Sequence, residues 1–577
     1  MLSAPPPALQ PAHIQAIQSS GGGSTVAGYP AMLLGVASLG LSACGGGGGG
    51  GTAQSAPIVS APVIPSEPPA PVISDSARFL TQATLGFTKA EIGEVDSIGP
   101  AAWIDRQFAI PLGSSNFDWM VSRGYDAPAN INSLTGIDNS LWQRLISARD
   151  SLRQRVSFAL SEILVIGAQG LTGPWRQFSA ANYADILERN AFGNYRTLLE
   201  EVTLSPAMGS YLTYRGNLKA NTRTGSVPDE NYAREVMQLF TIGLVALEPN
   251  GRPRLVGGQM QETYGLEDVT GLARVFTGYE YDVSGYTNPY PPQVVRRPMA
   301  HIESRYEFGE KRFLGTVIPA NTPAREALKI TLDTLFQHPN TAPFVSKQLI
   351  QRLVTSNPSP DYVQRVSAQF VNNGAGVRGD LKAVIRAILL DTEARSPDAA
   401  SAVGFGKVRE PMVRLLNWAR AFNATSPSGN FALGDLSDPS TRLGQSPLRS
   451  PSVFNFFRPN FSSVGLSNQG LVAPELQITT ETSTAGYLNY MQRAINSLGV
   501  GDLTPNYSEL IALAKTPKPL VDELALLFTA NSLSSSTRNA LISTLEAMPQ
   551  TTDAQLKNRV LAALLITLAS PEFIVQR

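Results

Sequence analysis

The 577-residue sequence has little cysteine, little histidine and no net charge. Its single cysteine, Cys44, excludes disulfides within the chain and thiolate metal clusters. Its three histidines make a histidine-rich zinc or iron site a poor fit. Because 46 basic side chains balance 46 acidic ones, no electrostatic argument supports binding to nucleic acid or to an anionic membrane. These absences exclude several classes of function, and the sequence does not indicate a cofactor.

Charged residues are absent from the first 66 positions. Within this tract an apolar run, residues 31–43, ends at Cys44. It is shorter than the roughly 20 residues that span a bilayer and suits the apolar region of a signal peptide. The tetrad Leu41-Ser-Ala-Cys44 resembles a bacterial lipobox, whose cysteine is acylated and becomes the mature N-terminus. We expect an exported protein anchored to a membrane through a lipid on Cys44; the alternative is a chance cysteine in a low-complexity leader.

A tether follows the predicted lipidation site. Seven glycines occupy residues 45–51, and a stretch rich in Pro, Ala, Ser and Val follows them. Glycine runs are flexible and proline-rich runs are extended, so this composition is typical of a spacer. The sequence therefore predicts a leader over residues 1–44, a tether over 45–75, a helical main domain over 76–498 and a helical C-terminal subdomain over 499–577.

From residue 76 onward the hydrophobic pattern is helical nearly throughout. Thr88 and Glu91 form the pattern of a capping box, and Pro100 stands at the start of the next helical stretch. Residues 304–308 and 311–314 predict a hairpin that turns at Gly309. Three long segments lack helical periodicity: residues 248–266, 281–297 and 424–473. We expect a mainly α fold, a large multi-helix body with one or two small β-hairpins and long irregular loops.

Several segments carry a family resemblance. They include residues 77–86, the block Pro228-Asp-Glu-Asn-Tyr-Ala-Arg-Glu-Val-Met-Gln-Leu-Phe-Thr-Ile-Gly243, and Ser570-Pro-Glu-Phe573. Together they resemble the bacterial family called domain of unknown function 1800, over about residues 76–577. The resemblance implies a large, mostly helical, exported protein, often encoded beside a second exported family, so a co-encoded exported protein is an expected partner. It implies no established activity.

One departure from that family concerns possible metal chemistry. Many relatives have a Trp-His-Asn-His-Phe stretch where this chain has Ala159-Leu-Ser-Glu-Ile163. Leu160 and Glu162 thus replace both histidines, which argues against any metal site built on that pair. Whether the chain binds a metal stays open.

The 228–243 block supplies the first catalytic candidates. It predicts a helix capped by Asp229 and ended at Gly243, with Tyr232 on its apolar stripe and as a candidate ligand contact. Glu230 and Glu235 are candidates for general acid–base catalysis or metal binding. The favoured alternative is that both form buried ion pairs with Arg234.

His301 is the best single catalytic candidate, since histidine suits proton transfer near neutral pH. An equally favoured alternative is that His301 is a loop histidine that hydrogen-bonds to the backbone. His338 precedes a proline, where a capping role is favoured.

The loop over residues 444–458 mixes aromatic rings with Gln445, Arg449 and Arg458. This composition predicts a ligand or glycan groove, and a buried aromatic clasp is the favoured alternative. Two hypotheses result. The preferred one is a lipid-anchored envelope protein, facing the periplasm or the outer surface, that binds a partner protein or polymer. The other is an exported enzyme, hydrolase-like or metal-assisted, that uses His301 and the Glu230/Glu235 face. Convergence of His301, Glu235 and Gln445 on one solvent-reachable pocket would favour it, and burial of both glutamates against an Arg would argue against it.

Overall fold

Helices account for most of the chain in the computed structural model, which describes residues 73–498 and 500–577. Cys44, the predicted leader and the glycine run lie outside the described residues. The prediction of a mainly α fold is confirmed: β structure among the described residues is limited to small two-stranded sheets and isolated β-bridges. None of the described helices is both long and apolar enough to span a bilayer.

The first half of the body is built around α6, whose residues are buried on every face except at Arg176 and Arg189. Helices α3, α4, α5, α7 and α8 all pack against it. A helix whose side chains are apolar or hydrogen-bonded on every face belongs at the centre of a bundle, and α6 lies at this centre. The helices of this half are α1 (Asp75–Ala83), α2 (Lys89–Ala109), α3 (Asn116–Ser122), α4 (Ile137–Ser147), α5 (Ser151–Ser161), α6 (Arg176–Asn190), α7 (Tyr195–Thr203), α8 (Pro206–Tyr211), α9 (Asn231–Gln238) and α10 (Leu266–Ala273).

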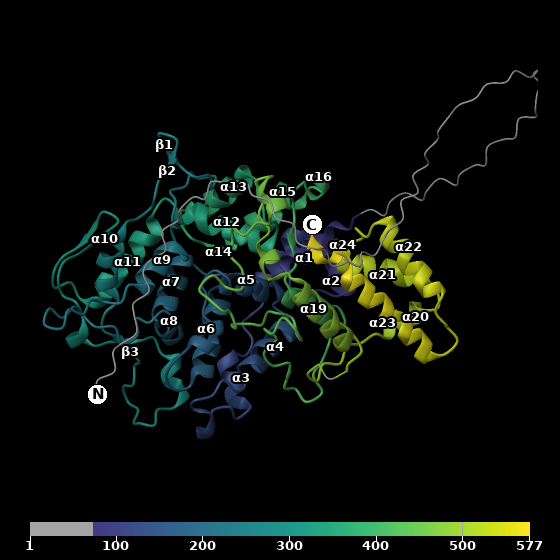
Figure 1. Ribbon diagram of the computed structural model, residues 1–577, viewed down its shortest axis with the longest axis horizontal. Coiled ribbons are helices and arrows are strands. Elements are labelled where there is room, and N and C mark those ends of the chain that lie inside the picture. Colours follow the sequence, from purple (N-terminus) through teal and green to yellow (C-terminus); the bar gives the residue numbers. More distant parts are fainter. Residues whose placement is uncertain (1–72, 499) are drawn as a thin grey trace, which may run out of the picture. The chain divides into compact units, whose positions relative to one another are not determined.

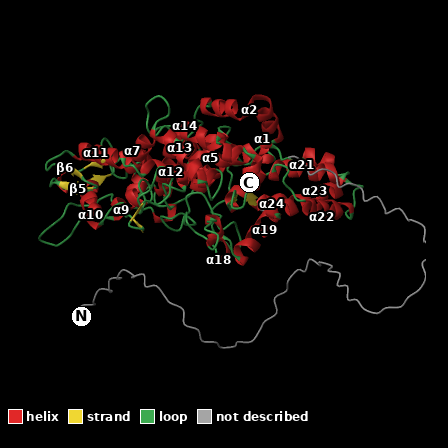
Figure 2. Cartoon of the chain, turned by 90° about the horizontal axis from the view of Figure 1, so that it is seen from above, coloured by secondary structure: helices red, strands yellow, loops and turns green. Residues whose placement is uncertain are grey.

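The second half continues the bundle and returns to its start. Helix α12 packs on both α5 and α13, and α21 packs on α1. Helices α21, α22 and α23 lie side by side at one end of the described part, and α10 and α11 lie at the other (Figures 1 and 2). These helices are α11 (Ala324–Gln337), α12 (Thr341–Leu353), α13 (Pro360–Val371), α14 (Leu381–Leu390), α15 (Thr392–Arg395), α16 (Pro397–Ser401), α17 (Pro411–Ala421), α18 (Val464–Ser467), α19 (Glu481–Ile495), α20 (Ser508–Leu513), α21 (Pro517–Thr529), α22 (Ser535–Glu546), α23 (Asp553–Ala569) and α24 (Pro571–Ile574).

Within residues 73–498 and 500–577, four antiparallel strand pairs hold loops in place. The strands are β1 (Leu255–Val256) with β2 (Gln259–Met260), β3 (Tyr279–Glu280) with β4 (Ala300–His301), β5 (Lys311–Phe313) with β6 (Thr316–Ile318), and β7 (Lys407–Val408) with β8 (Val575–Gln576). The β3–β4 pair closes the base of the irregular loop 281–297. The β7–β8 pair joins the end of the chain to the segment before α17. The predicted boundary near residue 498 stays a prediction, with α23 packed against α19 across it.

The sequence was right about one local signal and wrong about two. The Thr88–Glu91 capping box is present at the start of α2. The predicted hairpin at Gly309 is wrong: β5 pairs with β6 around Leu314 and Gly315, whose φ angles of 47° and 74° match a type I′ turn. The predicted helix start after Asp229 is one residue early, because α9 begins at Asn231, although the carboxylate of Asp229 does accept the N–H of Asn231 as a capping side chain would.

Candidate functional site

An open groove of about 700 Å³ contains His301, and we call it the His301 groove. It runs along α7 and the start of α11, beside the segment that leads into β4. Its charged lining is mostly basic; these side chains are Arg189, Arg296, Arg297, Arg325 and Lys329, against Glu200 and Glu201. The groove is therefore a positively biased surface on a chain whose net charge is zero.

The His301 ring is held by aromatic neighbours. Strand pairing places His301 opposite Tyr279, and the two ring centroids are 5.7 Å apart. Tyr306 meets the histidine edge-on at 4.8 Å. Burial against these rings lowers the pKa of His301, with Glu303 opposing the shift, so the imidazole is neutral at neutral pH. A neutral ring in a groove can donate or accept a hydrogen bond.

Most cations of the His301 groove already have a carboxylate partner at the surface. Lys329 pairs with Asp333 at 2.6 Å, and Arg297 pairs with Asp282 at 3.6 Å. Arg325 is exposed and has no ion pair among the described residues. Because exposed pairs contribute about 0–1 kcal/mol, an incoming anion can replace such partners at little cost.

Glu230 and Glu235 lie outside this groove and have different surroundings. Glu230 is half-buried, 3.4 Å from the guanidinium of Arg234, and accepts a hydrogen bond from Thr270 at 2.8 Å. Glu235 is buried, one of its carboxylate oxygens has no hydrogen-bond partner among the described residues, and burial raises its pKa while Arg234 lowers it. The two glutamates do not form one acid–base pair.

Tyr232 and His338 have structural surroundings. Tyr232 is fully buried, and its hydroxyl lies 2.6 Å from that of Thr203. The Nδ1 of His338 accepts the N–H of Asn340 at the turn that follows α11, which agrees with the favoured capping role.

The three candidate ligand contacts of loop 444–458, Gln445, Arg449 and Arg458, have separate surroundings. Arg449 forms a two-pronged pair with Asp138, at 3.0 and 2.6 Å, and so ties this loop to α4. Arg458 is exposed and lies over the ring of Phe454. Gln445 is buried and lines an interior cavity.

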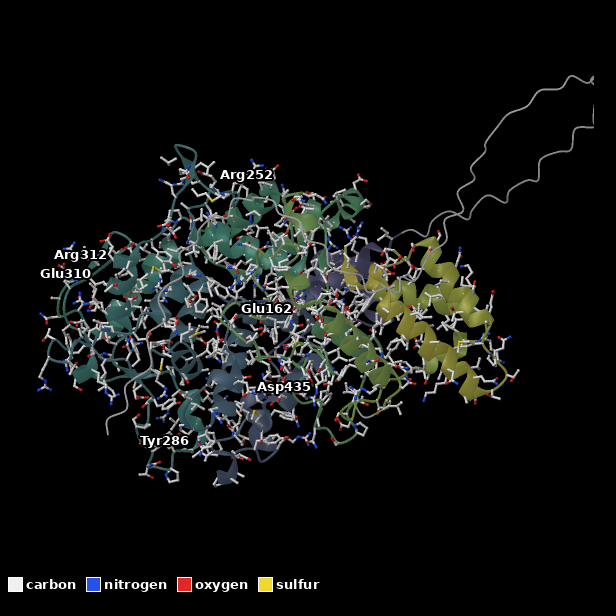
Figure 3. All side chains as sticks on the ribbon, in the orientation of Figure 1. Glu162, Arg252, Tyr286, Glu310, Arg312 and Asp435 are labelled. Carbon is white, nitrogen blue, oxygen red and sulfur yellow. The ribbon has the colours of Figure 1, made fainter. Side chains whose placement is uncertain are left out.

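This cavity, of about 60 Å³, lies between α5, α6, the start of α17 and the loop that carries Gln445, and Glu162 forms part of its wall. Glu162 is buried, and its label lies over the middle of the described part in the view of Figure 3. Asn455 donates to one carboxylate oxygen of Glu162 at 3.1 Å. The other oxygen has no hydrogen-bond partner among the described residues and lies 3.8 Å from Nε of Arg352.

A buried charge network extends from Glu162, and we call it the Glu162 cluster. Its other members are Arg352, Lys407, Glu410 and Glu475. The Nζ of Lys407 lies 3.2 Å from Glu475 and 3.5 Å from Glu410, and it donates to the carbonyl of Arg352 at 2.9 Å. Gln445 donates to Glu410 at 2.5 Å.

Two carboxyl groups of the cluster have pKa shifts in opposite directions. Burial and the negative charge of Glu410 raise the pKa of Glu162. At Glu410, burial by itself would raise the pKa, but the charge of Lys407 and the hydrogen bond from Gln445 hold the pKa below its ordinary value. Of these two carboxyl groups, Glu162 is therefore the one that holds a proton, and Glu410 is the one that is ionised. In chemical terms this is an acid–carboxylate pair beside a small cavity.

Sequence reasoning marked Glu162 only as the residue at a histidine position of relatives, and it missed Lys407, Glu410 and Glu475. Glu162 follows α5, Lys407 and Glu410 precede α17, and Glu475 lies in the 3-10 turn Pro474–Ile478. These three segments are far apart in the sequence. No short motif connects them, so only the fold brings them together.

A family model described as "Protein of unknown function (DUF1800)" matches residues 78–575. The chain belongs to the DUF1800 family. The match covers the His301 groove and the Glu162 cluster, so both lie within the DUF1800 region. No curated protein and no solved structure matches this DUF1800 chain.

Leu160 and Glu162, the residues at the two positions where the resemblance predicts histidines, differ in their surroundings. Leu160 is fully buried in the core, and Glu162 faces the cavity. Within the described residues no group of three or more His, Cys, Asp or Glu side chains is placed to hold a metal ion. In the Glu162 cluster the ammonium of Lys407 lies beside both Glu410 and Glu475 and supplies the positive charge they need.

Proposed function

We propose that this DUF1800 chain is an exported, lipid-anchored envelope protein whose His301 groove binds an acidic partner, protein or polymer. The groove carries the proposal: it is open, about 700 Å³ in volume, and lined by five basic and two acidic side chains. Carboxylate, phosphate or sulfate groups of a partner would pair with Arg325 and exchange with the surface acids that now pair with Lys329 and Arg297.

The placement of the candidate residues favours binding over chemistry. His301 lines the groove, Gln445 lines the interior cavity, and Glu235 lines neither. Convergence of these three on one pocket would have favoured the enzyme hypothesis, and they do not converge. Glu230 is paired with Arg234 at the surface, so the groove holds no carboxylate from that helix.

The proposed binding in the His301 groove is tested with two polyanions. Poly-L-glutamate represents an acidic protein, and dextran sulfate represents an acidic polymer. We expect salt-sensitive binding of at least one, and a loss of roughly tenfold in affinity for Lys329→Glu, Arg325→Glu. Lys557→Glu, an equally exposed lysine on α23, is the matched control and should bind like the parent chain. Equal binding by all variants would exclude the groove.

The anchoring half rests on the sequence around Cys44 and is tested separately. In cells that express the chain, a labelled fatty acid should be incorporated into the parent protein and not into Cys44→Ser. The variant should also leave the membrane fraction. Incorporation into Cys44→Ser, or an unlabelled parent chain, would contradict lipidation.

One observation favours an enzyme as the second candidate. The pKa values of Glu162 and Glu410 are shifted in opposite directions, and Glu162 lines a cavity, which is an arrangement suited to general acid–base catalysis. If a panel of chromogenic esters and glycosides reveals hydrolysis, Glu162→Gln should abolish it while the fold remains intact. Retained activity in that variant would remove Glu162 from the chemistry.

A further inference from the structure

Exposed apolar side chains gather in one stretch of the chain. Of the fifteen large hydrophobic residues that are exposed among the described residues, seven lie between positions 218 and 266. Three of them are at the tip of the β1–β2 hairpin: Leu255 is 57% exposed, Val256 58% and Met260 62%. Scattered exposed hydrophobics are ordinary, whereas a group of three on one short projection marks an interaction surface.

The hairpin is an ordered projection. Its strands turn through Gly257 and Gly258, whose φ angles of 60° and 82° suit a type I′ turn. Residues 252–262 are all exposed, and the hairpin stands out at the edge of the described part (Figure 1). Its stem is fastened to the preceding segment, because Ala246 donates to the carbonyl of Gln261 at 2.8 Å and accepts from the N–H of Arg254 at 2.7 Å.

The charged side chains of this hairpin are confined to its stem. Leu255 and Met260 are directly opposite partners across the strands and so lie on the same face. No charged residue occurs from position 255 to 261, and the first charges, Arg254 and Glu262, stand on the stem. Arg252, also on the stem, extends into solvent in Figure 3. An uncharged apolar end on a charged stem matches the change from acyl chains to headgroups at a bilayer surface.

We propose that this tip, defined by Leu255, Val256 and Met260, inserts into the surface of the bilayer that carries the lipid anchor. The inference rests on the proposed anchoring at Cys44. Residues 45–72 can span at most about 100 Å, so an anchored body stays within reach of that bilayer. The balanced charge of the chain argues against electrostatic adhesion, and insertion of uncharged side chains does not need it.

A second copy of the chain is a poorer occupant for this tip. Each of its strands is two residues long, which is too short an edge to support strand pairing between molecules. A bilayer requires only apolar area and no backbone pairing.

The test uses the full chain carrying Cys44→Ser, so that binding does not depend on lipidation. Vesicles of phosphatidylethanolamine and phosphatidylglycerol should sediment this protein. Adding Leu255→Ser, Met260→Ser should lower the partition coefficient by roughly tenfold or more, since it removes two exposed apolar side chains. The matched control is Val403→Ser, Val464→Ser, at residues that are 87% and 81% exposed elsewhere, and it should partition like the parent.

A second measurement locates the insertion. Leu255→Trp should show a blue-shifted emission when vesicles are added, and Val464→Trp should not. The proposal is overturned if Cys44→Ser protein does not bind vesicles, if both serine double variants bind alike, or if Leu255→Ser, Met260→Ser abolishes a dimer in sedimentation velocity without changing vesicle binding. Lack of fatty-acid labelling in cells would contradict the anchor alone and leave the vesicle result to stand on its own.

Discussion

The His301 groove and the Glu162 cluster use charged side chains in opposite settings. In the groove, Lys329 is 72% exposed and Arg297 35%, and each faces a surface acid. In the cluster, the side chains of Lys407, Glu410 and Glu475 are at most 3% exposed. Exposed pairs exchange with solvent and ligands, whereas a buried charge that loses its partner has no water to replace it. The charges of the groove are therefore exchangeable, and those of the cluster are fixed by the fold.

The largest expected effect comes from removing the cation of the cluster. Lys407→Met leaves Glu410 and Glu475 buried beside an apolar group, which should destabilise the fold by about 3–5 kcal/mol. Lys329→Met, its matched control in the groove, should stay within about 0.5 kcal/mol. Urea unfolding of the two variants checks this. Similar losses of stability in both variants would contradict the proposed difference between the buried and the exposed lysine.

Removing a hydrogen-bond donor from the cluster should have a smaller effect. Asn455→Ala takes away the side chain that donates to Glu162 at 3.1 Å. An unsatisfied buried acceptor costs about 1–3 kcal/mol. The same unfolding measurement checks the loss, and Asn250→Ala, in the loop before β1, should change stability little. An unchanged midpoint for Asn455→Ala would show that water replaces the amide.

Glu162→Gln should alter how stability depends on pH more than stability itself. The folded pKa of Glu162 is raised above its ordinary value of 4.5, so its favourable contribution is complete below about pH 4.5 and is lost as pH rises through the folded pKa. Glutamine keeps a neutral donor and needs no proton. We therefore expect the variant to gain stability relative to the parent as pH rises from 4.5 toward neutrality. Parallel melting curves from pH 4.5 to neutrality would show that Glu162 is not protonated in the fold.

The smallest effect is expected at His301. Because its ring is partly exposed and contacts Tyr279 and Tyr306 only by ring edges, His301→Gln should change stability by no more than about 0.5 kcal/mol. Its imidazole should titrate below the ordinary value of 6.5, since burial lowers the pKa. An NMR titration of histidine signals, assigned with His301→Gln, measures this. A midpoint above 6.5 would indicate a carboxylate partner in solution.

The candidate site was predicted unevenly. His301 and Gln445 were identified from residue type and local composition, and both line pockets, but different ones. The buried pairing expected for Glu230 became a half-buried surface pair with Arg234. Such errors have a common cause: helical spacing fixes which residues share a face, and it does not fix what that face packs against.

The sequence by itself determined what depends on local chemistry. Helical periodicity gave the mainly α fold, the Thr88–Glu91 spacing gave a capping box, and the motif blocks gave DUF1800 membership. Tertiary structure alone decided which distant side chains meet. Glu162, Lys407 and Glu475 come together because α5, β7 and the turn before α19 pack around one interior point, and no local signal specifies that packing. Long-range contacts are set by how whole faces fit, so the charge that folding buries and the charge it leaves exposed follow from the fold.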